Sequence, residues 1–128
     1  MFTRDGPLLA TWGAWNTAYS SELTRVEVRR TLYRLRTEGQ IDDLELAWAL
    51  TELQRVEAGI EFLPLAPTVL AFASEPTPLL KTLDALHLAT ARQVRALAAP
   101  DLVLGTHDRQ MATAAMALGF PIEGYEFS

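Results

Sequence analysis

The stretch DLVLGTHDRQM, residues 101–111, is the clearest indication of the fold class. Its apolar run predicts a buried strand over Asp101–Gly105, and a helix follows over Asp108–Leu118 until a glycine stops it. Open parallel sheets place their functional sites at the carboxyl ends of their strands, where Asp108 lies. The alternative is that Asp108 or Thr106 only caps the helix.

The rest of the chain alternates short strands with helices in the same way. Hydrophobic periodicity, with glycine and proline as stops, predicts helices over Pro7–Asn16, Glu22–Arg36, Leu44–Ala58, Pro67–Ser74 and Leu83–Leu97, and strands over Ala18–Ser21, Ile60–Leu63 and Phe120–Glu123. Strands separated by helices are typical of an α/β domain with a parallel sheet. Because no linker or repeat interrupts the chain, we expect a single domain over residues 1–128. A purely helical interaction protein is a weaker alternative, because it leaves the apolar runs that read as strands unexplained.

The composition of the chain excludes several kinds of site. There is no cysteine among the 128 residues, which rules out disulfides, thiolate zinc sites and cysteine nucleophiles. Only two histidines are present, so a metal site would consist mostly of carboxylates, which suit Mg²⁺ or Mn²⁺. The formal net charge is −5, so binding of a nucleic acid requires a local basic face or a metal ion.

Targeting signals are not evident in the sequence. The first residues lack an apolar core of signal-peptide length, and no apolar stretch is long enough to span a bilayer. We therefore expect a cytoplasmic protein with no membrane partner.

Three segments together resemble a known family. They are SELTRVEVRR at residues 21–30, LDALHLATA at residues 83–91 and LVLGTHDRQM at residues 102–111. In order and spacing they resemble the motifs of PIN-domain ribonucleases, in particular the VapC-type toxins of bacterial toxin–antitoxin pairs. The resemblance implies a three-layer α/β domain and a toxin-type endoribonuclease that depends on Mg²⁺ or Mn²⁺. It also implies an RNA substrate, an antitoxin partner and a homodimer.

The resemblance also implies site residues. Glu27, Asp84 and Asp108 match the acidic metal ligands of the family, and Thr106 matches the hydroxyl that often accompanies the last acid. These four are the candidate catalytic residues. The three acids are 57 and 24 residues apart, so only tertiary structure could unite them, and a cation would offset their repulsion. We expect His87 to have a structural, hydrogen-bonded role near this site.

One part of the family pattern is not matched. PIN domains open with a hydrophobic strand that ends in an aspartate, and nothing before Asp5 resembles it. We therefore expect a PIN-like domain that lacks its central N-terminal strand, with impaired activity and with an altered dimer or a swapped element filling the gap. A start codon assigned too far downstream, a shortened gene product and a trimmed protein are alternative explanations. A non-catalytic module that binds an antitoxin or RNA is the alternative function.

A basic stripe suggests where RNA binds. Arg25, Arg29 and Arg36 fall on one narrow face of the predicted helix at Glu22–Arg36, and we take Arg25 and Arg29 as candidate RNA-binding residues. A solvated surface stripe is the alternative. Partial exposure of Trp12 or Trp48 would fit a protein interface.

Overall fold

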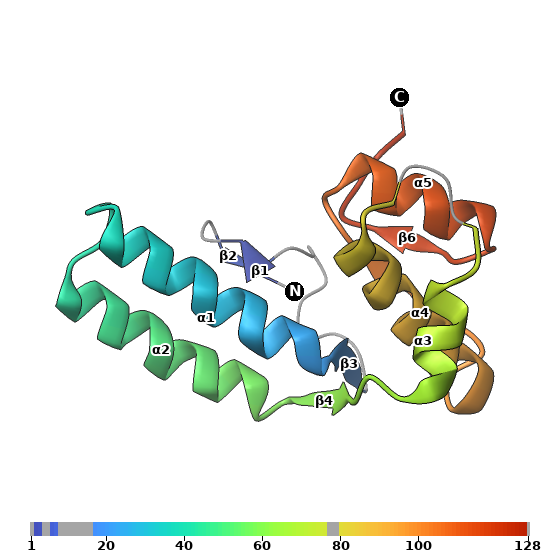
Figure 1. Ribbon diagram of the computed structural model, residues 1–128, viewed down its shortest axis with the longest axis horizontal. Helices are drawn as coiled ribbons and strands as arrows, with labels where there is room; N and C mark the ends of the chain where they lie inside the picture. Colours follow the sequence, from blue (N-terminus) through green and yellow to red (C-terminus); the bar gives the residue numbers. More distant parts are fainter. Residues whose placement is uncertain (1, 4–5, 8–16, 77–79, 128) are drawn as a thin grey trace.

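The computed structural model describes residues 2–3, 6–7, 17–76 and 80–127 (Figure 1). The elements follow in the order β1 (Phe2–Thr3), β2 (Gly6–Pro7), β3 (Ala18–Ser21), α1 (Glu22–Thr37), α2 (Asp43–Glu57), β4 (Ile60–Leu63), α3 (Pro67–Ala73), α4 (Thr82–Leu97), β5 (Leu104–Gly105), α5 (Arg109–Ala117) and β6 (Ile122–Glu123). Strands and helices alternate as predicted. The helix expected over Pro7–Asn16 falls on residues 8–16, which lie outside the described residues, and Pro7 itself belongs to β2.

The parallel pairing of strands is confirmed. β3 pairs with β4 in register from Ala18 opposite Ile60 to Ser21 opposite Leu63, and β5 pairs with β6. Within the described part these pairs, like the antiparallel β1–β2 pair, are separate two-stranded ladders. The predicted parallel sheet is therefore not continuous in the described residues, since no described strand pairs with the second edge of β3 or of β5.

The last two strands are shorter than predicted, for a local reason. Leu102 N donates to the Ala99 carbonyl at 3.0 Å in the turn after α4, so β5 does not extend back to Asp101. Phe120 N donates to the Ala115 carbonyl at 3.0 Å, so it ends α5 rather than joining β6. Backbone donors used in turns are not available to a ladder.

Helices α1 and α2 form a hairpin that extends away from α3, α4 and α5 (Figure 1). Ser21 is the N-cap of α1, and its hydroxyl accepts a hydrogen bond from Leu23 N at 3.1 Å. Asp42 and Glu45 form a capping box at the start of α2. Gly39 has φ 76°, a conformation that favours glycine, in the turn between the helices.

The main apolar core lies between α4, α5 and the β5–β6 pair. Its buried members are Leu88, Met111, Ala114, Ala115 and Phe120. Helix α3 packs on α4, which in turn packs against β3. Helix α4 also contacts α5, and α1 contacts β3. Each of α1, α4 and α5 carries one of the predicted acids.

Candidate active site

Each predicted acid occupies the early part of a helix. Glu27 lies in the second turn of α1, which follows β3 directly, and Asp84 lies in the first turn of α4. Asp108 is the N-cap of α5, three residues after β5 ends. Two of the three acids therefore follow the carboxyl ends of parallel strands, as the sequence predicted.

The pKa of Asp84 is affected by the charges of both other predicted acids. Partial burial raises the pKa of the Asp84 carboxyl, and the negative charges of Asp108 and, to a smaller extent, Glu27 raise it further. His87 and Lys81 act in the opposite direction. The fold thus brings side chains that are far apart in the sequence close enough to repel one another.

Glu27 has a partner on another helix. Nε2 of His87, on α4, is hydrogen-bonded to Oε1 of Glu27, on α1. The His87 side chain is only 17% exposed, whereas that of Glu27 is 37% exposed. The expected hydrogen-bonded role of His87 is confirmed, and its partner is one of the predicted metal ligands.

Asp108 and Thr106 shape the turn between β5 and α5. Asp108 Oδ1 accepts a hydrogen bond from Met111 N at 3.0 Å, so the aspartate does cap the helix. Thr106 is fully buried, and its Oγ1 accepts from Asp108 N at 3.0 Å. The threonine therefore acts on the backbone that presents Asp108, and capping occupies one of the two carboxylate oxygens.

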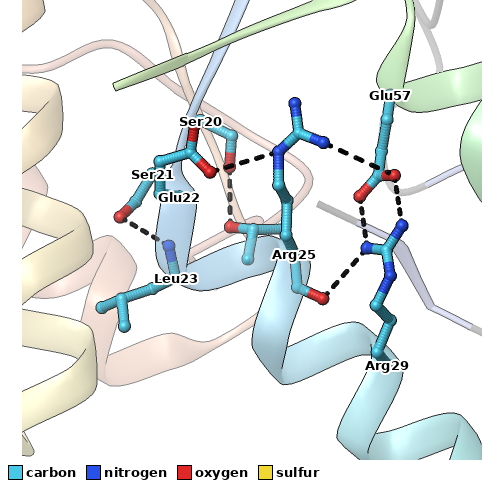
Figure 2. A network of polar contacts seen from close by, with 8 residues as sticks. Ser20, Ser21, Glu22, Leu23, Arg25, Arg29 and Glu57 are labelled. Atoms are coloured by element: carbon cyan, nitrogen blue, oxygen red, sulfur yellow. Dashed lines mark hydrogen bonds and ion pairs between the residues drawn. The ribbon is translucent and has the colours of Figure 1, made fainter. Parts of the chain in front are cut away.

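Arg25 and Arg29 of the basic stripe are engaged within the chain (Figure 2). Both terminal nitrogens of Arg29 donate to Glu57, each at 2.7 Å, and Nη1 also donates to the Arg25 carbonyl at 3.1 Å. Arg25 pairs with Glu22 at 3.2 Å, approaches Glu57 at 3.9 Å and lies over the Phe62 ring at 4.0 Å. The Glu57 side chain is only 7% exposed, and its contacts with Arg25 and Arg29 link α1 to the end of α2.

Sequence reasoning missed Glu57 as the partner of these arginines. The surrounding surface is hollowed, with Arg25, Arg29, Gln54, Glu57 and Ala58 lining the depression. The only signal in the sequence was a carboxylate at the end of a helix, where the helix dipole disfavours negative charge unless a cation compensates it.

Comparison with known proteins agrees with this geometry. The PIN domain family matches residues 6–116, a span that contains all four candidate catalytic residues. The chain belongs to the PIN-domain family. Ribonuclease VapC35 from two strains of Mycobacterium tuberculosis, CDC 1551 / Oshkosh and ATCC 25618 / H37Rv, is 37% identical to this PIN domain over 102 residues, which cover 63% of this chain and 75% of the relative. No solved structure matches the chain.

PIN-domain ribonucleases generally depend on divalent metal ions, so the fit of these side chains to such an ion matters. Three carboxylates offer the oxygen donors that hard divalent cations prefer, and the repulsion around Asp84 is what a cation would relieve. Among the described residues, no group of three acidic or histidine side chains lies close enough to ligate one ion directly. The donor chemistry therefore fits an ion that keeps several of its waters, as Mg²⁺ usually does.

The described helices of this PIN domain include none that is both long enough and apolar enough to cross a bilayer.

Proposed function

We propose that this PIN domain is a toxin-type endoribonuclease that hydrolyses RNA phosphodiester bonds with Mg²⁺ or Mn²⁺ held by Glu27, Asp84 and Asp108. The observation that carries the proposal is the placement of the three acids, one near the start of each of α1, α4 and α5, with Glu27 hydrogen-bonded to His87 one turn after Asp84. Burial raises the pKa of the Asp84 carboxyl, and the charges of Asp108 and Glu27 raise it further, in keeping with this placement. The similarity to Ribonuclease VapC35 supports the ribonuclease activity. We also propose that residues 1–128 act as one domain, in the cytoplasm.

The chain's own residues have distinct roles in this proposal. Asp84 is the central acid, because the negative charges of both other carboxylates, together with burial, act on its pKa. Thr106 orders the turn that presents Asp108, and His87 holds Glu27. When bound, the ion supplies a nucleophilic water and stabilises charge on the phosphate oxygens. No histidine is needed as a general base.

In this proposal, Arg25 is the main residue that contacts the RNA. The Arg25 side chain is 42% exposed and lies on the Phe62 ring, whereas Arg29 is 30% exposed and donates through both terminal nitrogens to Glu57. We propose that Arg25 contacts an RNA phosphate and that Arg29 supports it through the Arg25 carbonyl.

The test compares RNA cleavage by the wild-type chain and Asp84→Asn, with Mn²⁺ and with a chelator. We expect cleavage only with the ion, and a loss of roughly 100-fold or more in Asp84→Asn, because an amide is a poor ligand for a hard cation. Asp101→Asn is the matched control, since Asp101 is an exposed acid in the turn after the other end of α4. Cleavage that persists in the chelator, or in Asp84→Asn, would contradict the proposal.

A non-catalytic module that binds an antitoxin or RNA is the second candidate function. It is favoured by one observation, that the described acids do not converge on a single ligand position. RNA or antitoxin binding by a chain that cleaves nothing at any ion concentration would establish this function instead.

Protein partners are also part of the proposal. Leu44 and Trp48, one helical turn apart on α2, are each 69% exposed, which is unusual for large apolar side chains. We propose that the chain forms a homodimer through this part of α2 and binds a cognate antitoxin. Trp12, the other tryptophan expected at an interface, lies outside the described residues.

A further inference from the structure

The contact between His87 and Glu27 joins two helices that each carry a candidate metal ligand. The two residues are 60 positions apart in the sequence, and the hydrogen bond links Nε2 of the imidazole to Oε1 of the carboxylate. His87 lies three residues after Asp84, so both side chains project from neighbouring positions on the same side of α4. The Glu27 carboxylate is therefore bonded to a side chain that lies one helical turn after Asp84.

We propose that His87 is a positioning residue, which holds the carboxylate of Glu27 beside Asp84 so that the two acids present their oxygens to the same ion. This role deepens the proposed ribonuclease function and rests on it. It is a geometric role: His87 binds one oxygen of Glu27 and leaves the other, Oε2, for the ion. His87 itself is neither a ligand nor a general base in this proposal.

The need for a positioning residue follows from the properties of Glu27. A glutamate side chain has three rotatable bonds, and ordering it costs conformational entropy. The Asp84 carboxylate also repels it, because the two negative charges lie close enough for Glu27 to raise the pKa of Asp84. Without a partner, the partly exposed Glu27 side chain would turn toward solvent, and the cluster would lose one ligand before the ion arrives.

The position of His87 suits this role. Its side chain is only 17% exposed, so the imidazole has little freedom to move. Hydrogen bonds to metal-binding carboxylates commonly set metal affinity, and their loss typically costs roughly 10-fold to 100-fold.

The experiment measures the dissociation constant for Mn²⁺ by electron paramagnetic resonance of the free ion, using the full chain. His87→Leu keeps an apolar side chain of similar size without a hydrogen-bonding atom, and we expect it to weaken Mn²⁺ binding about 10-fold. His87→Gln retains an amide nitrogen at a similar reach, and we expect binding within about threefold of wild type. His87→Ala replaces the leucine variant if that variant does not fold.

Two comparisons separate positioning from a merely structural role. In a Glu27→Gln background, His87→Leu should weaken Mn²⁺ binding less than about twofold, because its effect acts through Glu27. Arg92→Gln is the matched control, since it removes another ion pair of α4, to Glu75, through a side chain that is also mostly buried. We expect Arg92→Gln to lower thermal stability without changing Mn²⁺ affinity.

The outcomes distinguish this inference from the proposed function. Wild-type affinity in His87→Leu, or an equal loss in the Glu27→Gln background, would overturn the positioning role. Mn²⁺ binding that depends on His87, in a chain that cleaves no RNA, would support the positioning role and overturn the ribonuclease activity. Binding that is unchanged in Asp84→Asn would overturn both.

Discussion

Asp108 caps helix α5 and also carries one of the three charges of the acidic cluster. Its Oδ1 accepts the hydrogen bond of Met111 N. After burial, the charge of Asp108 is the main cause that raises the pKa of Asp84, ahead of the charge of Glu27. Both interpretations that the sequence allowed for this residue are therefore compatible with its geometry. Substitution can separate them, because capping requires an oxygen acceptor whereas an ion requires a charge.

We predict different effects for two substitutions of Asp108. Asp108→Asn keeps an oxygen acceptor for Met111 N, so the free energy of unfolding should change by less than about 0.5 kcal/mol, while Mn²⁺ binding falls at least about 10-fold. Asp108→Ala should lose about 1 kcal/mol of stability as well. Urea unfolding and Mn²⁺ titration measure the two effects. Equal Mn²⁺ affinity in wild type and Asp108→Asn would leave capping as the whole role of the residue.

Removal of charge at Asp84 should have opposite effects on stability and function. Its raised pKa means that burial and the nearby carboxylates disfavour the charged form in the folded chain without metal. We predict that Asp84→Asn raises the melting temperature by about 2 to 4 °C in chelator, while it abolishes stabilisation by Mn²⁺. Thermal unfolding with and without Mn²⁺ measures this. A lower melting temperature in chelator would show that the Asp84 charge stabilises the fold.

At the scale of the elements, the junction of α1 and α2 depends on one buried ion pair. Glu57 lies at the end of α2, where its negative charge opposes the helix dipole, and the bidentate contact with Arg29 compensates for this. That contact holds the pKa of the Glu57 carboxyl below its usual value. Arg29 is thereby a structural residue first, and a charge reversal there would disrupt the hairpin rather than test RNA binding.

We predict that Glu57→Gln lowers the free energy of unfolding by about 2 kcal/mol at neutral pH, because it leaves a partly buried guanidinium without its carboxylate. The pKa of Glu57 is lowered by folding, so the pair contributes its full stability above pH 4.5 and loses it as the pH falls through the lowered value. The difference between wild type and Glu57→Gln should therefore shrink below pH 4.5.

Denaturant unfolding over a range of pH measures this dependence. Glu38→Gln is the control, because the Arg34–Glu38 pair is exposed and its nearest atoms are 4.0 Å apart. It should leave stability nearly unchanged at every pH. A gap between wild type and Glu57→Gln that stays constant in acid would exclude the ion pair as its cause.

At the scale of the whole molecule, the α1–α2 hairpin projects from the body that contains the core (Figure 1). Trp48 and Leu44 lie exposed on this hairpin, whereas the buried apolar residues gather around α4 and α5. A projecting helix with large exposed apolar side chains is typical of an interface, because burial of these side chains would stabilise association.

We predict that the wild-type chain is a dimer at micromolar concentration and that Trp48→Glu shifts it to monomer, because a charge at the interface centre is strongly unfavourable. Light scattering coupled to size-exclusion chromatography measures the mass. Leu97→Glu is the control, since Leu97 is a similarly exposed apolar residue at the end of α4, away from the hairpin. A monomeric wild-type chain would contradict the dimer, and a dimeric Trp48→Glu would exclude this surface.

The sequence by itself determined the features that depend on near neighbours. Helix starts at Ser21 and Asp108 were predictable because a cap acts on an amide two or three residues away, and the strand at Ile60–Leu63 because its apolar run is local. The family was predictable because its motifs are short segments in a fixed order, and the match over residues 6–116 confirms it.

Only the tertiary structure decided which distant side chains meet. The contact of His87 with Glu27 spans 60 residues, and that of Arg29 with Glu57 spans 28. Nothing in either local pattern identifies the partner, because the contact depends on how α1 packs against α2 and α4. The effect of the Asp108 charge on the pKa of Asp84 likewise depends on how the helices pack. Periodicity and capping act within a few residues, whereas a site made of charges from three helices exists only after those helices have packed.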